Sequence, residues 1–221
     1  MDRVKIKESA KQKIKGNIWN LLWPLLIIGV LEGLLNNIFG GSSNQALVNL
    51  DLSNLDVNAI SDSIKATSSP ISFIINIIFS VINIAYLKYV LDFVRTGKFD
   101  ANSIIECLKT KWLNLLIVSL ITGIATTIGF MLLIVPGVIV AIGLGMAGLI
   151  VIDSDLSAID AIKKSWEMMK GYKWNYFVFL LSFLGWIILA PFTLFILFIW
   201  LIPYMTVAEV LYYEELKKIT K

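Results

Sequence analysis

The chain has 221 residues, of which 57% are hydrophobic and only 16% are charged, and its mean hydropathy is +0.80. Charged residues make up about a quarter of a typical soluble domain, so this composition excludes an ordinary soluble protein. The net charge of +3 is small and requires no nucleic-acid partner. The composition instead predicts apolar helices of about 20 residues, which is the length that crosses a bilayer.

Six apolar segments follow one another along the chain. The last four form two pairs, with short joins at Val135–Gly137 and at Pro191. Short joins favour helical hairpins, because some 40 continuous apolar residues would overshoot a bilayer about 30 Å thick and proline interrupts a helix. The predicted spans are residues 17–40, 71–94, 112–134, 138–152, 174–190 and 192–213.

The positive residues orient these six spans. If both termini are cytoplasmic, 18 of the 19 Lys and Arg residues lie on the inner side, and Lys65 alone lies outside. Positive residues in short loops stay in the cytoplasm, and five or seven spans would break this segregation. The sequence therefore predicts an all-α membrane protein with one membrane domain, six transmembrane helices in three hairpins, and both termini inside.

Each hairpin follows a segment with amphipathic spacing. Residues 1–16 are basic and weakly amphipathic, and residues 100–112 read "DANSIIECLKTKW". Residues 157–171 are strongly amphipathic, and Ser157 with Asp160 predicts a helix start of the capping-box type. We expect three units, each a cytoplasmic amphipathic helix followed by a hairpin.

A short motif marks the entry to two of these hairpins. "KGNIWN" at Lys15–Asn20 and "KGYKWN" at Lys170–Asn175 share four of six residues. Their glycines, Gly16 and Gly171, permit a bend between surface helix and span, and Trp and Lys are favoured at the membrane interface. The alternative is that Trp and Lys were placed independently at two membrane boundaries, without a repeat. The predicted interface anchors are Lys15, Trp19, Lys111, Trp112, Lys170, Lys173 and Trp174.

The longest polar stretch, residues 41–70, joins the first two spans and is rich in Ser, Asn and Asp. The six-span topology places it outside the cell. Loops of this length are uncommon unless they are functional or disordered. An amphipathic lid and a mobile segment both stay open as interpretations.

Polar residues inside the first two spans are the main candidates for a site. Glu32 and Asn36 lie one turn apart in the first span, and Asn76 and Asn83 share a face of the second. Ionisable residues within spans are costly and often functional. We expect a polar track that holds a cation, a proton or a lipid headgroup; the alternative is hydrogen bonding that only fixes helix packing.

The residue inventory argues against an enzyme. The chain has no histidine and a single cysteine, Cys107, which removes Ser-His catalysis, histidine-zinc sites and the usual general base near neutral pH. We expect no metal and no cofactor.

Several stretches resemble a bacterial family of integral membrane proteins, the domain-of-unknown-function 975 family. They are "VPG" (135–137), residues 157–189 with "MKGYKW" and "LSFLGW", "LIPYM" (201–205), "YYEEL" (212–216) and, near the N-terminus, "KIKGNIW". The resemblance implies a multi-span architecture, and we expect the chain in the bacterial cytoplasmic membrane. The family is also distantly similar to the membrane domain of some bacterial glycerophosphodiesterases. Hydrolase activity is not expected to carry over.

Three functions fit these features. The leading hypothesis is non-enzymatic binding or transport of a lipid or small amphiphile, as part of envelope protection. The alternatives are an accessory subunit that docks on another membrane protein, and an ion channel. We expect anionic lipid headgroups as partners at the inner face, with a homo-oligomer or a membrane protein as a further partner.

Overall fold

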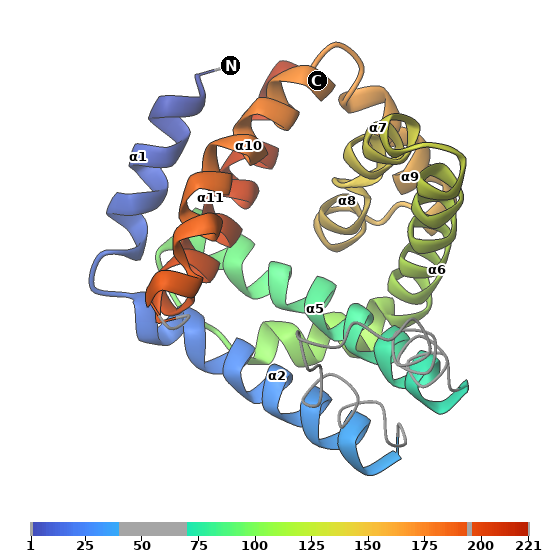
Figure 1. Cartoon of the computed structure of the whole chain (residues 1–221), viewed down its shortest axis with the longest axis horizontal. Helices are drawn as coiled ribbons and strands as arrows, with labels where there is room; N and C mark the ends of the chain where they lie inside the picture. The colour runs from blue at the N-terminus through green and yellow to red at the C-terminus, as the bar shows by residue number, and fades with distance from the viewer. Residues whose placement is uncertain (1, 40–69, 194–195, 221) are drawn as a thin grey trace, which may run out of the picture.

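The protein is described by a computed structural model over residues 2–39, 70–193 and 196–220, and this part contains helices and no strand (Figure 1). The predicted outer stretch 41–70 lies outside the described residues, except for Pro70, which begins a helix. The elements are α1 (Arg3–Ile14), α2 (Ile18–Phe39), α5 (Pro70–Thr96), α6 (Asn102–Leu132), α7 (Ile134–Leu144), α8 (Ala147–Asp153), α9 (Ala158–Met168), α10 (Lys173–Leu189), η1 (Pro191–Thr193) and α11 (Leu197–Ile219).

Four helical segments in the described residues are long and apolar enough to cross a membrane. They are α2, α5, α6 and the α7–α8 pair, Ile134–Asp153. A fifth arises if α9 and α10, which are bent by 88° at their join, count as one broken span. The described residues therefore contain four or five helical segments that could span a membrane, in an all-helical fold as predicted.

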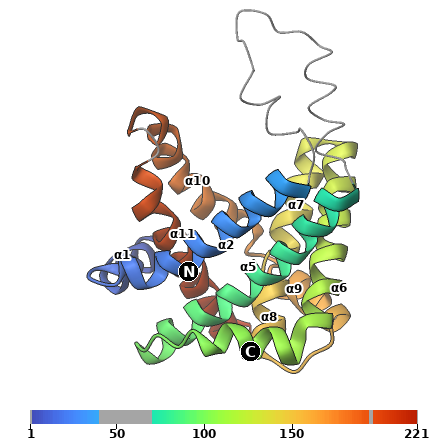
Figure 2. The same ribbon diagram turned by 90° about the horizontal axis from the view of Figure 1, so that it is seen from below.

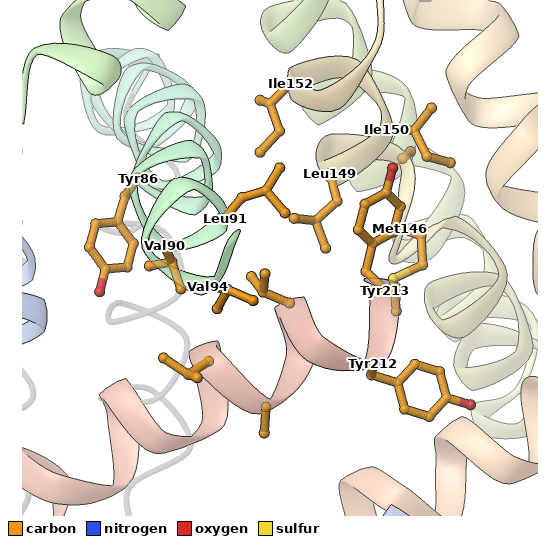
Figure 3. Close-up of a cluster of buried hydrophobic side chains, with 14 of the residues drawn as sticks. Tyr86, Val90, Leu91, Val94, Met146, Leu149, Ile150, Ile152, Tyr212 and Tyr213 are labelled. Carbon is orange, nitrogen blue, oxygen red and sulfur yellow. The ribbon is translucent and has the colours of Figure 1, made fainter. Parts of the chain in front are cut away.

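The core lies where α5, α8 and α11 meet (Figure 3). Apolar and aromatic side chains from these three helices gather there and are buried. They include Tyr86, Val90, Leu91 and Val94 from α5, Met146 just before α8, Leu149, Ile150 and Ile152 from α8, and Tyr212 and Tyr213 from α11. The short helix α8 is thus enclosed by its neighbours, and this packing fixes the position of the residues between α7 and α8.

A proline in α2 is compensated by tyrosines of α5. Pro24 has no N–H, so the carbonyl oxygen of Asn20, four residues earlier, loses its helical donor. The Tyr89 hydroxyl donates to that oxygen at 2.7 Å. The Tyr86 hydroxyl donates to the neighbouring Leu21 carbonyl at 2.8 Å. These two bonds attach α2 to α5 at the proline.

Glycines in the left-handed region end three helical stretches. Gly16 (φ 81°) lies between α1 and α2, and Gly171 (φ 85°) lies between α9 and α10. The bends predicted at these two residues are confirmed. Gly97 (φ 73°) adds a third between α5 and α6. L side chains rarely adopt such φ values, which explains the choice of glycine.

The middle unit differs from its prediction. A separate surface helix over 100–112 was expected before the third span, but α6 runs without a break from Asn102 to Leu132. No glycine or proline occurs between Asn102 and Trp112, so nothing interrupts the backbone hydrogen bonds of the helix. The expected threefold repeat is therefore wrong in its middle copy.

The predicted fourth span, 138–152, is two helices. The turn after α6 lies at Leu133, which is extended (φ −166°, ψ 156°), so α7 begins four residues early. Pro136 stands in the first turn of α7, where its missing N–H costs no helical bond. A second break, at Gly145 and Met146, separates α7 from α8. The predicted join at Val135–Gly137 is wrong for this reason.

The C-terminal segment also differs from its predicted bounds. The expected span 192–213 divides into η1 and α11, and α11 continues to Ile219. The N-terminal helix α1 packs against α11 through a face that buries Ile6, Ala10 and Ile14. The first and last helices of the chain therefore lie side by side.

The surface helix α9 lies within the predicted segment 157–171 and begins as expected. The Ser157 hydroxyl oxygen accepts a hydrogen bond from the Asp160 backbone N–H. The helix packs closely on α7: the Ser165 hydroxyl donates to the Gly143 carbonyl at 2.9 Å. A Cβ atom at Gly143 would lie 2.5 Å from the Trp166 ring. Gly143 is therefore required by helix packing.

The turns of the bundle lie at two ends (Figure 2). The turn between α6 and α7 and the tip formed by α10 and α11 point to one side. The turn between α5 and α6 and the C-terminal end of the described chain lie toward the other side. The paired helices α6–α7 and α10–α11 thus leave one end of the bundle and return to it.

Candidate functional site: a polar cleft beside an apolar groove

A cleft of about 730 Å³ lies between α5, α6 and the α7–α8 break, with α2 at one edge. We call it the polar cleft. It is lined by Glu32, Asn76, Ser80, Asn83, Ile84, Leu87, Val118, Ser119, Thr122, Gly123, Thr126, Thr127, Ala141, Leu144, Gly145 and Gly148. Every helix that contributes to this lining belongs to a segment apolar enough to span a membrane. Half of the lining residues are nevertheless polar.

The structure brings the predicted polar track together. Glu32, Asn76 and Asn83 line the cleft. Asn36 lies next to it, and its side-chain amide donates to the Asn76 amide oxygen at 3.4 Å. This bond crosses from α2 to α5. The interhelical hydrogen bond that was the structural alternative is therefore present at one edge of the cleft.

The α6 side of the cleft was missed by the sequence analysis. Ser119, Thr122 and Thr126 stand at spacings of three and four, which places them on one helix face. That face meets Ser80 and Asn83 of α5 across the cleft. The helical spacing of small hydroxyl residues in an apolar run was the available signal.

Three of the five hydroxyl groups that line the cleft, those of Ser80, Ser119 and Thr122, donate within their own helix. Ser80 donates to the Ile77 carbonyl at 2.7 Å, and Ser119 donates to the Leu116 carbonyl at 3.0 Å. Thr122 donates to the Val118 carbonyl at 2.7 Å, and the Asn83 amide donates to the Phe79 carbonyl at 2.9 Å. These polar groups therefore keep acceptor capacity for anything else they bind.

An apolar groove of about 420 Å³ adjoins the polar cleft. We call it the apolar groove. The two share Asn76, Ser80, Ser119, Gly123 and Thr127. The remaining groove residues are Phe73, Ile77, Leu120, Ile124 and Ile128 from α5 and α6. A polar and an apolar compartment thus have one wall in common.

The three tryptophans among the predicted anchors are open on the protein surface. The exposed fractions are 69% for Trp19, 55% for Trp112 and 73% for Trp174. Lys15 and Lys170 are also exposed. Such positions suit contact with lipid or headgroups.

The other two lysine anchors have partners within the protein. The Lys111 ammonium donates to the carbonyl oxygens of Val151 at 3.0 Å and Ser154 at 2.7 Å. These carbonyls end α8, where helical partners are missing. The Lys173 ammonium lies 3.1 Å from the centre of the Trp166 ring, a cation–π contact. Both lysines therefore hold helix ends together.

A buried ion-pair network lies at the end of α8 and was not predicted. The Asp153 side chain is 4% exposed and pairs with Arg95 of α5 and Lys217 of α11, each at 2.5 Å. The Tyr213 hydroxyl donates to the same carboxylate at 2.8 Å. Arg95 also pairs with Glu214 at 2.5 Å. The network ties the three core helices together. Sequence reasoning could not pair residues so far apart in the chain.

Comparison with known proteins gives a family for the C-terminal part. Residues 127–220 match the model of the family described as "Protein of unknown function (DUF975)". The expected resemblance to this family is confirmed over these residues. The DUF975 match covers α7 to α11 and the Thr127 end of the cleft, whereas Glu32 and α5 precede it. No curated protein and no solved structure gives a match.

Proposed function

We propose that this protein is a multi-pass protein of the bacterial cytoplasmic membrane that binds or moves a lipid or small amphiphile without catalysing a reaction. The observation that carries the proposal is the common wall of the polar cleft and the apolar groove. An amphiphile has the same division: its headgroup fits the cleft, and its hydrocarbon chain fits the groove.

The sizes support this assignment. Pockets for small organic ligands have volumes of roughly 300–1,000 Å³, and the cleft, at about 730 Å³, falls in that range. A bare ion would need far less space. Groove residues such as Phe73 and Ile124 offer apolar contacts to the hydrocarbon chain of the amphiphile.

The direct test fills the site from within. Gly123 belongs to both compartments, and a Cβ added to it meets no atom within 4 Å, so Gly123→Leu should fold while occupying the site. Gly185→Leu is the matched control, because Gly185 also has open space around it but lies on α10. Native mass spectrometry of protein extracted in its own lipids would compare the amphiphile that each form retains.

Retention by the wild type and Gly185→Leu, with at least a tenfold loss in Gly123→Leu, is the expected result. Equal retention by all three forms would remove the cleft and groove as the binding site. Absence of any bound amphiphile, both after extraction and after addition of lipid, would remove the function itself.

The proposal includes the six-span topology with both termini inside, for which the positive residues are the support. Phe192 is 82% exposed at η1, and Asp155 is fully exposed after α8. With Cys107 replaced by Ser, we expect an impermeant maleimide on whole cells to label Phe192→Cys. Asp155→Cys should be labelled only after permeabilisation. Labelling of both from one side would contradict six spans and leave the cleft unaffected.

A further inference from the structure

The charge of the polar cleft has one sign. Among the residues that line it in the described part of the chain, Glu32 alone is ionisable at neutral pH. The other polar lining residues are Asn, Ser and Thr, which are neutral. An anionic headgroup would face this carboxylate without a cation from the lining to offset it. The cleft therefore favours a positively charged ligand.

The hydrogen-bonding character of the cleft points the same way. Ser80, Ser119 and Thr122 each have one hydroxyl hydrogen, and each donates it to a carbonyl of its own helix. Toward a ligand these oxygens can therefore only accept. Asn83 also uses an amide hydrogen within its helix, which leaves its amide oxygen as an acceptor. Three hydroxyl oxygens, one amide oxygen and one carboxylate suit a ligand rich in N–H donors.

The two asparagines of the cleft also keep donors, since an amide NH₂ has two hydrogens and Asn83 uses one of them within its helix. The Asn76 amide oxygen accepts from Asn36, so its NH₂ group remains the donor. Neutral amide donors of this kind suit a neutral acceptor on the ligand, such as an ester or hydroxyl oxygen. They do not replace the basic side chains that recognise phosphate or sulfate.

We infer that the polar cleft selects an amphiphile whose headgroup is a protonated amine with N–H donors, held by Glu32 and by the hydroxyl oxygens of Ser80, Ser119 and Thr122. The inference rests on the proposed function and names its ligand class. It separates three headgroups: an ammonium satisfies charge and acceptors, a trimethylammonium satisfies charge alone, and a sulfate satisfies neither.

The experiment uses three surfactants with the same dodecyl chain. Radiolabelled dodecylammonium, dodecyltrimethylammonium and dodecyl sulfate are bound at equilibrium to the full-length protein in nonionic micelles. We expect dodecylammonium to bind about tenfold tighter than dodecyltrimethylammonium, since a charge-assisted hydrogen bond contributes about 1.4 kcal/mol or more. Dodecyl sulfate should bind at least a hundredfold more weakly than dodecylammonium.

Two variants separate charge from hydrogen bonding. Glu32→Gln removes the charge and should weaken both cationic surfactants at least tenfold, without weakening the sulfate. Thr122→Val keeps the side-chain shape but removes the hydroxyl acceptor. It should weaken dodecylammonium several-fold and leave dodecyltrimethylammonium unchanged, because that headgroup has no N–H to donate. Glu106→Gln is the control, since Glu106 is exposed on α6 outside the cleft.

The outcomes distinguish the inference from the function on which it rests. Equal binding of all three surfactants, lost in Gly123→Leu but insensitive to Glu32→Gln, would overturn the amine and keep the amphiphile site. Equal binding of the two cations would overturn the requirement for N–H donors. Failure of every surfactant to bind the wild type would overturn the proposed function as well.

Discussion

The Tyr89 hydroxyl donates to the carbonyl oxygen of Asn20 at 2.7 Å, the acceptor that Pro24 leaves without a helical partner. A proline inside a membrane-spanning helix is tolerated where another group satisfies the freed carbonyl. Here a side chain from the neighbouring helix does so. The proline and the tyrosine therefore act as a pair.

This pairing predicts the effect of Tyr89→Phe. Removal of the hydroxyl leaves a partly buried carbonyl without this donor and should destabilise the protein by about 0.5–1.5 kcal/mol. Pro24→Ala restores the backbone N–H, so the double variant Pro24→Ala/Tyr89→Phe should recover most of this loss. Thermal unfolding in detergent measures all three forms. Additive effects of the two changes would show that the residues are not coupled.

The ion-pair network predicts a large effect of Asp153→Asn. Removing one partner of a buried pair costs about 3–5 kcal/mol, and the value here should lie at the low end because Arg95 and Lys217 are each about one-third exposed. The unfolding midpoint should fall by several degrees. Asp155→Asn is the control: Asp155 is fully exposed beside Lys111, and exposed ion pairs contribute little to stability. Equal midpoints for the two variants would remove the network from the stability of the fold.

The contact between α7 and α9 predicts that Gly143→Ala is destabilising. The added methyl would lie 2.5 Å from the Trp166 ring, and overpacking of this kind costs about 1–3 kcal/mol. Gly185→Ala, which meets no atom within 4 Å, should instead be neutral or stabilising. Trp166→Ala should make Gly143→Ala harmless. A Gly143→Ala midpoint that is unchanged in the presence of Trp166 would contradict this packing.

The two kinds of lysine anchor predict different losses. Lys111→Met removes a charged donor from the end of α8 and should cost roughly 1.5–3 kcal/mol, whatever lipid is present. Lys170→Met should change the free energy of unfolding by no more than about 0.5 kcal/mol, as other surface substitutions do. It should instead weaken retention of anionic lipid. If the loss of stability in Lys111→Met depended on anionic lipid, Lys111 would contact lipid headgroups, as the sequence predicted.

Local chemistry in the sequence was sufficient for much of the fold. The positive-φ bends at Gly16 and Gly171 and the Ser157 cap depend on neighbouring residues, which explains why pattern reasoning found them. The break within the fourth span could not be found this way. The packing of α9 on α7 could not be found this way either, because Trp166 lies more than twenty positions from Gly143 in the sequence and meets it only in the folded chain.

The candidate site likewise contains residues that the sequence indicated and residues that only the folded structure brings together. Glu32 and the asparagines are conspicuous because polar residues are rare in apolar runs. Serine and threonine are common in transmembrane helices, so Ser119 and Thr122 are recognised as site residues only once the structure places them opposite α5. The apolar groove could not be predicted at all, because its residues are ordinary lipid-compatible side chains whose arrangement depends on how α5 and α6 cross.

The packing of α1 on α11 has a consequence for how the protein is made. At synthesis rates of about 5–20 residues per second, roughly 10–40 s pass between the appearance of the first helix and the last. During this interval Ile6, Ala10 and Ile14 have no α11 to cover them. The newborn chain must therefore shelter this apolar face, against the bilayer surface or an insertion factor, until α11 has been synthesised and can cover it.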